Sequence, residues 1–252
     1  MKTFCFTVDD NIRFLKEIME SGCDSIFDHP YLAMYRRLHE QFGLKVQMNL
    51  FNRMDGFQLS QMSDAYRSEW LENADWLKLS FHSEYEKVRA YEFSGYDEVY
   101  HDCRNVHEQI LRFASSVSLA KTTTIHYCLA TQDGVRALAD NQIEGLLGLF
   151  GSGISYSLDE VSAEKIRSGQ IVKKDGISFA AIDVVLNCWS KEENLKQLER
   201  LVERDHINVM IHEQYFYPDY RAYQPDFEEK ISAAFAFLQS NAYQSKFLEE
   251  LL

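Results

Sequence analysis

The stretch MKTFCFTVDDN, residues 1–11, begins like a buried strand and ends in two adjacent acidic residues before its final Asn. Lys2 to Val8 has the β-branched and aromatic content of a strand that enters a core. Nothing in that role calls for two like charges side by side, yet Asp9 and Asp10 end the run. Either an aspartate caps the helix that follows, which is a common use of this residue, or the two carboxylates bind another group.

The composition is that of a compact globular protein. The chain has 252 residues, 46% of them hydrophobic, which is enough for one large core. No linker or low-complexity stretch divides it, so we predict a single domain over residues 1–252. The formal net charge of -13 repels nucleic acid and anionic membrane surfaces. A small or neutral substrate is therefore expected, and neither nucleic acid nor a membrane is an expected partner.

The cysteines indicate a reducing compartment. There are five, an odd number, and they are never spaced as Cys-x-x-Cys, which disfavours both a disulfide framework and a thiolate metal site. The N-terminus lacks the apolar run of a signal peptide, and no later run approaches the ~20 apolar residues of a membrane span. These features predict a cytoplasmic protein. The oligomeric state is not indicated.

Strand-like and helix-like segments alternate along the chain. Amphipathic helical patterns cover residues 30–42 and 97–114, and a third follows Pro225. This βαβα order predicts an α/β fold with a largely parallel sheet and helices outside, either closed as a barrel or open and doubly wound. The strand patterns lie over residues 2–8, 45–51, 76–81, 122–129, 145–150, 177–186 and 207–212.

Polar side chains gather where these strands end. The aspartate pair follows the first strand, HSEYE at residues 82–86 follows the third, His126 and Tyr127 lie late in the fourth, and His212 ends the last. Parallel strands present their carboxyl ends at one rim, where loops converge and chemistry takes place. We therefore expect these side chains to meet at a common site.

Each residue also has a structural interpretation. Asp10 is a candidate N-cap for the next helix. His82 and Glu86 are four apart, which on a helical turn places them on one face but also suits an ordinary surface pair. His126 could be a core histidine satisfied by a backbone group. The joint order of the motifs favours the functional interpretation.

That order resembles the NodB-like polysaccharide deacetylases, which are carbohydrate esterase family four. The family runs from a Thr-Phe-Asp-Asp motif through His-Ser/Thr-x-x-His to a late Leu-x-His. The matching pieces are FTVDD at residues 6–10, HSEYE at 82–86 and MIH at 210–212. The resemblance covers most of the chain and implies the family's fold, an irregular seven-stranded (β/α) barrel of TIM-like form.

The sequence departs from the family pattern at several positions. Asn11 stands where the family usually has Gly, and Glu86 replaces the second metal-binding His. The Arg-x-Pro-Tyr motif is absent around residues 125–128. Asp183 is a loose candidate for the acid that tunes the late His.

The resemblance implies a divalent metal site. The ligands carried over are Asp10, His82 and Glu86, and His126 is the first alternative if these three do not converge. Two carboxylates with one imidazole form a harder set than the family's one carboxylate with two imidazoles. Such a set still suits Zn, but it moves the preference toward Mn, Mg or Fe(II).

The resemblance also implies a reaction, the hydrolysis of an acyl group, typically acetyl, from an N-acylated sugar or a small amide. Asp9 would be the base, and His212 as imidazolium would donate a proton to the leaving amine. Tyr127 or a backbone N–H would support the oxyanion. The residues expected to contact substrate are His126, Tyr127 and Tyr215.

Two other functions stay open. A glycosidase on the same barrel would use two carboxylates about 5 to 9 Å apart, but the adjacent Asp9 and Asp10 would point to opposite sides of an extended strand. A non-catalytic member that binds a glycan or a partner is compatible with the missing arginine motif. Metal content separates the deacetylase from the binding protein.

Overall fold

The computed structural model describes residues 1–86, 91–150 and 155–252. The strands in these ranges are β1 (Lys2–Asn11), β2 (Val46–Met54), β3 (Phe57–Gln58), β4 (Leu77–Tyr85), β5 (Thr122–Thr123), β6 (Gly145–Gly148), β7 (Val172–Lys174), β8 (Ile177–Ala181), β9 (Val184–Val185), β10 (His206–His212) and β11 (Tyr243–Ser245). The α-helices are α1 (Arg13–Ser21), α2 (Pro30–Phe42), α3 (Arg67–Glu72), α4 (Tyr96–Phe113), α5 (Gln132–Asp140), α6 (Glu160–Arg167), α7 (Lys191–Arg200) and α8 (Phe227–Ser240).

The strands form two sheets. The larger has the order β3-β2-β1-β10-β9, with β4 paired to β2 and β11 to β1, and the smaller has the order β5-β6-β8-β7. All the pairs are parallel except β2 with β3 and β7 with β8. Strands β8 and β9 carry the chain from the smaller sheet to the larger, because β8 pairs with β6 and β9 with β10.

The two sheets meet again between β4 and β5, where the pairing is sparse. Among the described residues, one isolated bridge joins Leu79 to Leu119, and beyond it the Thr123 hydroxyl donates to the Phe81 carbonyl. The strands thus follow one another around a ring in the order β1, β2, β4, β5, β6, β8 with β9, and β10, but the ladders do not close it. The predicted seven-stranded (β/α) barrel is confirmed in this irregular, open form.

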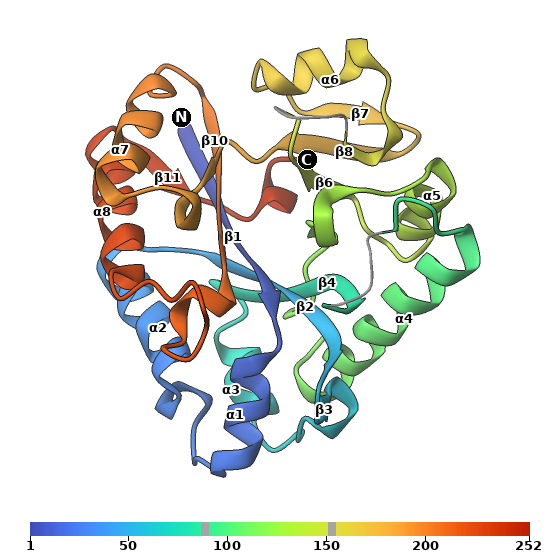
Figure 1. Ribbon diagram of the computed structural model, residues 1–252, viewed down its shortest axis with the longest axis vertical. Helices are drawn as coiled ribbons and strands as arrows, with labels where there is room; N and C mark the ends of the chain where they lie inside the picture. Colours follow the sequence, from blue (N-terminus) through green and yellow to red (C-terminus); the bar gives the residue numbers. More distant parts are fainter. Residues whose placement is uncertain (87–90, 151–154) are drawn as a thin grey trace.

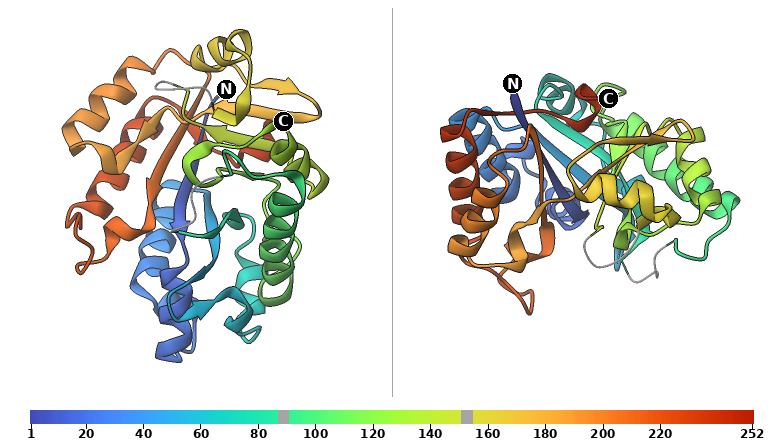
Figure 2. Two further views of the ribbon diagram at one scale, coloured as in Figure 1. Left: turned by 45° about the vertical axis from the view of Figure 1, so that its right-hand side comes forward. Right: turned by 90° about the horizontal axis from the view of Figure 1, so that it is seen from above.

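Helices cover the outside of the sheets. Helices α2, α7 and α8 lie on one side and α4 with α5 on the other (Figure 1), and the view from above shows the strands between the two groups (Figure 2). Phe235 of α8 packs on Phe4 and Phe6 of β1, with ring centroids 5.3 and 4.9 Å apart. Within the described ranges, no helix combines the length and apolar character needed to cross a membrane.

The structure agrees with some of the predicted elements and differs from others. Helix α2 has the predicted bounds, with Pro at its first position and a left-handed Gly43 after its end. The predicted strand over residues 122–129 is wrong beyond Thr123, because the chain turns into a 3₁₀ segment, η3 (His126–Cys128). A helical turn over residues 82–86, which would have placed His82 and Glu86 on one face, is not formed, since β4 runs on to Tyr85.

The first turn of α1 is capped from the far end of the chain. Glu213 starts the 3₁₀ segment η6 (Glu213–Phe216), and its carboxylate accepts from the backbone N–H groups of Ile12 (2.7 Å), Arg13 (3.1 Å) and Phe14 (2.7 Å). Those groups have no partner inside the helix. Asp10 is therefore not the N-cap, which leaves its carboxylate available for another use.

Removing this cap should cost more than removing a local one. In Glu213→Ala, two buried and one partly buried backbone donors lose their acceptor, and at about 1–3 kcal/mol for each unsatisfied group we expect a loss of about 3 kcal/mol or more in the free energy of unfolding. The control is Ser190→Ala, which removes the local cap of α7 and should cost about 1 kcal/mol. Equal losses in denaturant titrations of the two variants would contradict this role for Glu213.

Candidate metal centre

A bulge in β1 turns both aspartates toward one cavity. From Val8 to Asn11, β1 advances three residues while its partner β2 advances two, and Asp10 lies in the extra length with a φ of 62°. The Asn11 side chain steadies the bulge by donating to the Val8 carbonyl (2.5 Å). Asp9 and Asp10 consequently line the same cavity. The expectation that they face opposite sides is wrong, because it assumed a regular strand.

A second bulge places His82. Leu50 and Phe51 of β2 pair with Phe81 and Ser83 of β4, so His82 is the additional residue. Bulges re-aim side chains in this way, often beside active sites. The His82 ring turns inward, and it is almost completely buried.

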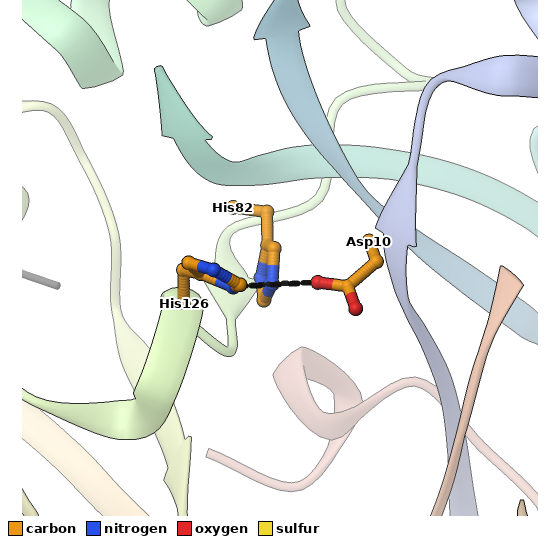
Figure 3. Close-up of side chains that lie close together, drawn as sticks. All are labelled: Asp10, His82 and His126. Carbon is orange, nitrogen blue, oxygen red and sulfur yellow. Dashed lines mark hydrogen bonds and ion pairs between the residues drawn. The ribbon is translucent and has the colours of Figure 1, made fainter. Parts of the chain in front are cut away.

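Asp10, His82 and His126 converge at the centre of the site (Figure 3). Asp10 Oδ1 lies 3.0 Å from His82 Nε2 and 3.3 Å from His126 Nδ1, and the two ring nitrogens are 3.3 Å apart. These three residues form the group of potential metal ligands among the residues that the structure describes. In a tetrahedral site with bonds of ~2.0–2.1 Å, ligand atoms lie about 3.3 Å apart, so the spacing fits an ion.

The outer hydrogen bonds of the two rings set which nitrogen faces the centre. His82 Nδ1 lies 2.5 Å from the Thr124 carbonyl oxygen, and His126 Nε2 lies 3.1 Å from the Glu86 carbonyl oxygen. A carbonyl only accepts, so these outer nitrogens carry the hydrogens. In the neutral rings, the lone pairs of the inner nitrogens then point at Asp10 and at each other. Such an arrangement calls for a cation between them, and the carbonyl contacts are the second-shell bonds typical of metal-binding histidines.

The charges of the site shift its pKa values. Burial raises the pKa of Asp10, but the imidazoles of His126 and His82 outweigh it and hold that pKa well below the usual range. Burial lowers the pKa of His82, but the carboxylates of Asp9 and Asp10 outweigh it and raise that pKa. Burial raises the pKa of Asp9, although His82 and other neighbours act against it. Asp9 is thus the stronger proton acceptor of the two aspartates.

Glu86, which the sequence motif suggested as a ligand, does not join this group. Residues four apart are neighbours on a helical turn but not along a strand, where each residue adds ~3.3 Å, and β4 continues from His82 to Tyr85. Glu86 is exposed just after β4 and lines the cavity, and its carbonyl oxygen lies 3.1 Å from His126 Nε2. His126, expected to contact substrate, takes the third position instead.

Asp9 and His212 lie on neighbouring strands beside this centre. They are register partners in the β1–β10 pair and line the same cavity of about 510 Å³. Tyr127 and Tyr215, predicted to contact substrate, also line it. The remaining lining residues are Asp10, His82, Glu86, Ile125, His126, Cys128, Leu149, Val185, Cys188, Met210, Gln214 and Tyr220.

His212 is oriented by an amide. Asn187 Oδ1 lies 2.9 Å from His212 Nδ1 and also accepts from the His212 backbone N–H at 3.2 Å. The suggestion that Asp183 tunes this ring is wrong. Asp183 is bonded to Arg204 (2.6 Å) and to the backbone N–H of Asn208 (2.8 Å). Burial raises the pKa of Asp183 to about 6.

The turn that carries His126 is conformationally strained. Tyr127 and Cys128 both have left-handed backbones, with φ of 62° and 57°, a conformation that costs of order 1–3 kcal/mol for a residue other than glycine. The Tyr127 ring is 63% exposed and lies against His126, with centroids 4.2 Å apart. Strain of this kind persists where the surrounding structure over-determines it, as at a binding site.

Besides Asn187, sequence reasoning missed two polar residues of the site, both of which contact the aspartates. Gln214 donates to the second oxygen of Asp10 (2.7 Å), and Asn49 donates to Asp9 (2.7 Å). Gln214 directly follows His212 and Glu213 and had no motif to mark it. Asn49 had a signal, because QMN in residues 47–49 places two amides on one face of the buried part of β2.

Comparison with known proteins identifies the fold. No family model matches the sequence, and no curated protein matches it. Among solved structures, it is similar to a family 4 acetyl xylan esterase from Clostridium thermocellum, solved with a cobalt ion, at 11% identity and a TM-score of 0.52, over 99% of this chain and 90% of that one. A peptidoglycan N-acetylglucosamine deacetylase matches at 10% identity and a TM-score of 0.57, over 99% and 87%.

A third similar structure has another activity. The 4-α-glucanotransferase from Thermococcus litoralis matches at 14% identity and a TM-score of 0.63, over 99% of this chain but 40% of that one. Taken together, these likenesses show that the chain has the polysaccharide deacetylase fold, as the motifs predicted. At such low identity they do not extend to activity.

Metal analysis of variants tests the ligand set. We expect the parent to bind one divalent ion per chain, and Asp10→Asn or His126→Ala to weaken binding by at least about 100-fold, since even outer partners of a metal site are worth 10–100-fold. Glu86→Gln is the control and should bind within a factor of about three of the parent. Strong loss in Glu86→Gln with none in His126→Ala would restore the ligand set suggested by the motif.

Proposed function

We propose that the protein is a metal-dependent hydrolase that removes an acyl group, typically acetyl, from an N-acylated sugar or a related small amide. The observation that carries this proposal is the convergence of Asp10, His82 and His126 beside Asp9 and His212 in one cavity. A metal cradle, a base and an acid are the parts that amide hydrolysis requires. The deacetylases that share the fold supply supporting analogy.

The donor set suits a divalent ion. One carboxylate and two imidazoles is a combination found in catalytic zinc sites and in Fe(II) sites. Compared with the two-carboxylate set implied by the motif, it moves the preference back toward Zn, with Fe(II) and Mn as the other candidates. An ion held there would polarise the acyl carbonyl and make a water molecule easier to deprotonate.

Asp9 and His212 divide the proton transfers. Asp9 is buried beside Asp10, and its raised pKa suits it to accept the proton of the attacking water. Asn187 holds the Nδ1 side of His212, which leaves Nε2 to donate a proton to the departing amine. Tyr127, Tyr215 and Tyr220 at the mouth are suited to stacking on sugar rings.

Glycoside transfer is the second candidate, because the glucanotransferase shares the fold and the β1 bulge brings both aspartates to one cavity. Asp10, however, is in contact with two imidazoles and Gln214, which disfavours it as a catalytic carboxylate for glycosidic-bond cleavage. Release of a small acid with no cleavage of a glycosidic bond separates the two functions.

Acyl hydrolysis can be tested directly with the metal-loaded protein. On a panel of N-acylated mono- and oligosaccharides, we expect release of acetate or another small acid. Asp9→Asn should lower kcat by about 10²- to 10⁴-fold with the metal still bound, because general-base assistance is lost. Asp10→Asn should lose the metal itself. Turnover of Asp9→Asn at the parental rate would contradict the mechanism.

The partner of His212 should set the pH dependence. In Asn187→Asp, a carboxylate stabilises the imidazolium more than an amide does, so the alkaline limb of the kcat profile should move to higher pH by about one unit. The shift must be toward higher pH, because a general acid acts only while it is protonated. Asp183→Asn is the control and should leave the limb in place. An unshifted limb in Asn187→Asp would exclude His212 as the acid.

A further inference from the structure

A chain of hydrogen bonds crosses the barrel interior and ends on Asp9. The Thr122 hydroxyl donates to Gln47 Oε1 (2.8 Å), Gln47 Nε2 donates to Asn49 Oδ1 (2.8 Å), and Asn49 Nδ2 donates to Asp9 Oδ1 (2.7 Å). The four residues are 0–2% exposed and come from β5, β2 and β1. Because β4 lies between β2 and β5 in the ring, this chain spans the interior instead of following neighbouring strands.

A backbone carbonyl fixes the direction of the chain. Gln47 Nε2 also donates to the Thr122 carbonyl oxygen (2.9 Å). That oxygen can only accept, so the amide nitrogen of Gln47 must lie on the side of Thr122 and Asn49. Asn49 must then turn its oxygen toward Gln47 and its NH₂ toward Asp9. The barrel therefore presents a donor to the base.

We propose that Asn49 is a positioning residue for the general base, an inference that rests on the proposed function. By holding Oδ1 of Asp9, Asn49 leaves Oδ2 to accept the proton of the attacking water. A hydrogen bond to an ionised carboxylate in a buried site is stronger than one in water. The base is thus held by a neutral amide whose own orientation is set by Gln47 and Thr122.

Two variants interrupt the series of hydrogen bonds at different points. Asn49→Leu keeps the approximate volume and removes the donor. In Gln47→Glu the substituted carboxylate is acceptor-only when it is ionised, so at a pH where it is ionised Asn49 turns its NH₂ toward position 47 and presents its oxygen to Asp9. We expect each to lower kcat by about 10²-fold, as for a misplaced catalytic group, with KM and metal affinity within threefold of the parent. A residue that only filled space would not make kcat sensitive to Gln47→Glu.

The matched control is Asn208→Leu. Asn208 is another buried asparagine of the sheet, and its amide donates to the Ala181 carbonyl at 2.8 Å. This variant should lower the melting temperature and leave kcat within twofold. If Asn49→Leu or Gln47→Glu keeps kcat within twofold while folded, or if Asn208→Leu loses as much, the proposal is overturned. Should Asn49→Leu not fold, Gln47→Glu decides alone.

Assays of the unsubstituted protein distinguish a failure of the proposed function from a failure of the role proposed for Asn49. If the metal-loaded parent hydrolyses none of the panel, the proposed function fails, and the position of Asp9 is then read from crystal structures of the parent and Asn49→Leu. A rotated Asp9 carboxylate in the variant supports positioning by Asn49. An unmoved carboxylate overturns it.

Discussion

The left-handed backbone at Asp10 is the constraint on which the site depends. A regular strand would send the side chains of adjacent residues to opposite faces. The extra residue in β1, held by the Asn11 amide across Val8, brings both carboxylates to one cavity at the cost of an unfavourable φ. The groups around Asp10 then over-determine its position, since two imidazoles and Gln214 contact its two oxygens.

The bulge also explains how two like charges are tolerated side by side. Asp10 is the more stabilised anion, because His82 and His126 lower its pKa. Asp9 receives one amide donor, and its burial raises its pKa. Neighbouring carboxyl groups thus acquire different proton affinities from different surroundings, which suits one to bind a cation and the other to exchange a proton.

The local sequence pattern was enough to predict individual helices and strands. The apolar spacing and the Pro and Gly boundaries gave α2 its bounds, and the apolar run before His212 identified β10. The rim positions of Asp9, Asp10, His82 and His212 followed from the strand order. The conformation of residues 82–86 could not be predicted, because a bulge set by pairing with β2 continued the strand through a motif that fits a helical turn equally well. The partnership of Asn187 with His212 depends on how β9 meets β10, and no local signature records it.

The sparse junction between β4 and β5 has a consequence for the energetics of the fold. His82 belongs to β4, His126 follows β5, and Asp10 comes from β1. An ion held by all three would therefore act as a cross-link over a junction where the described strands share an isolated bridge and no ladder. Its binding free energy would count toward barrel closure, so that stability and ion concentration are thermodynamically linked. The candidate metal ligands and the groups that join the two sheets at this junction would then be the same three side chains.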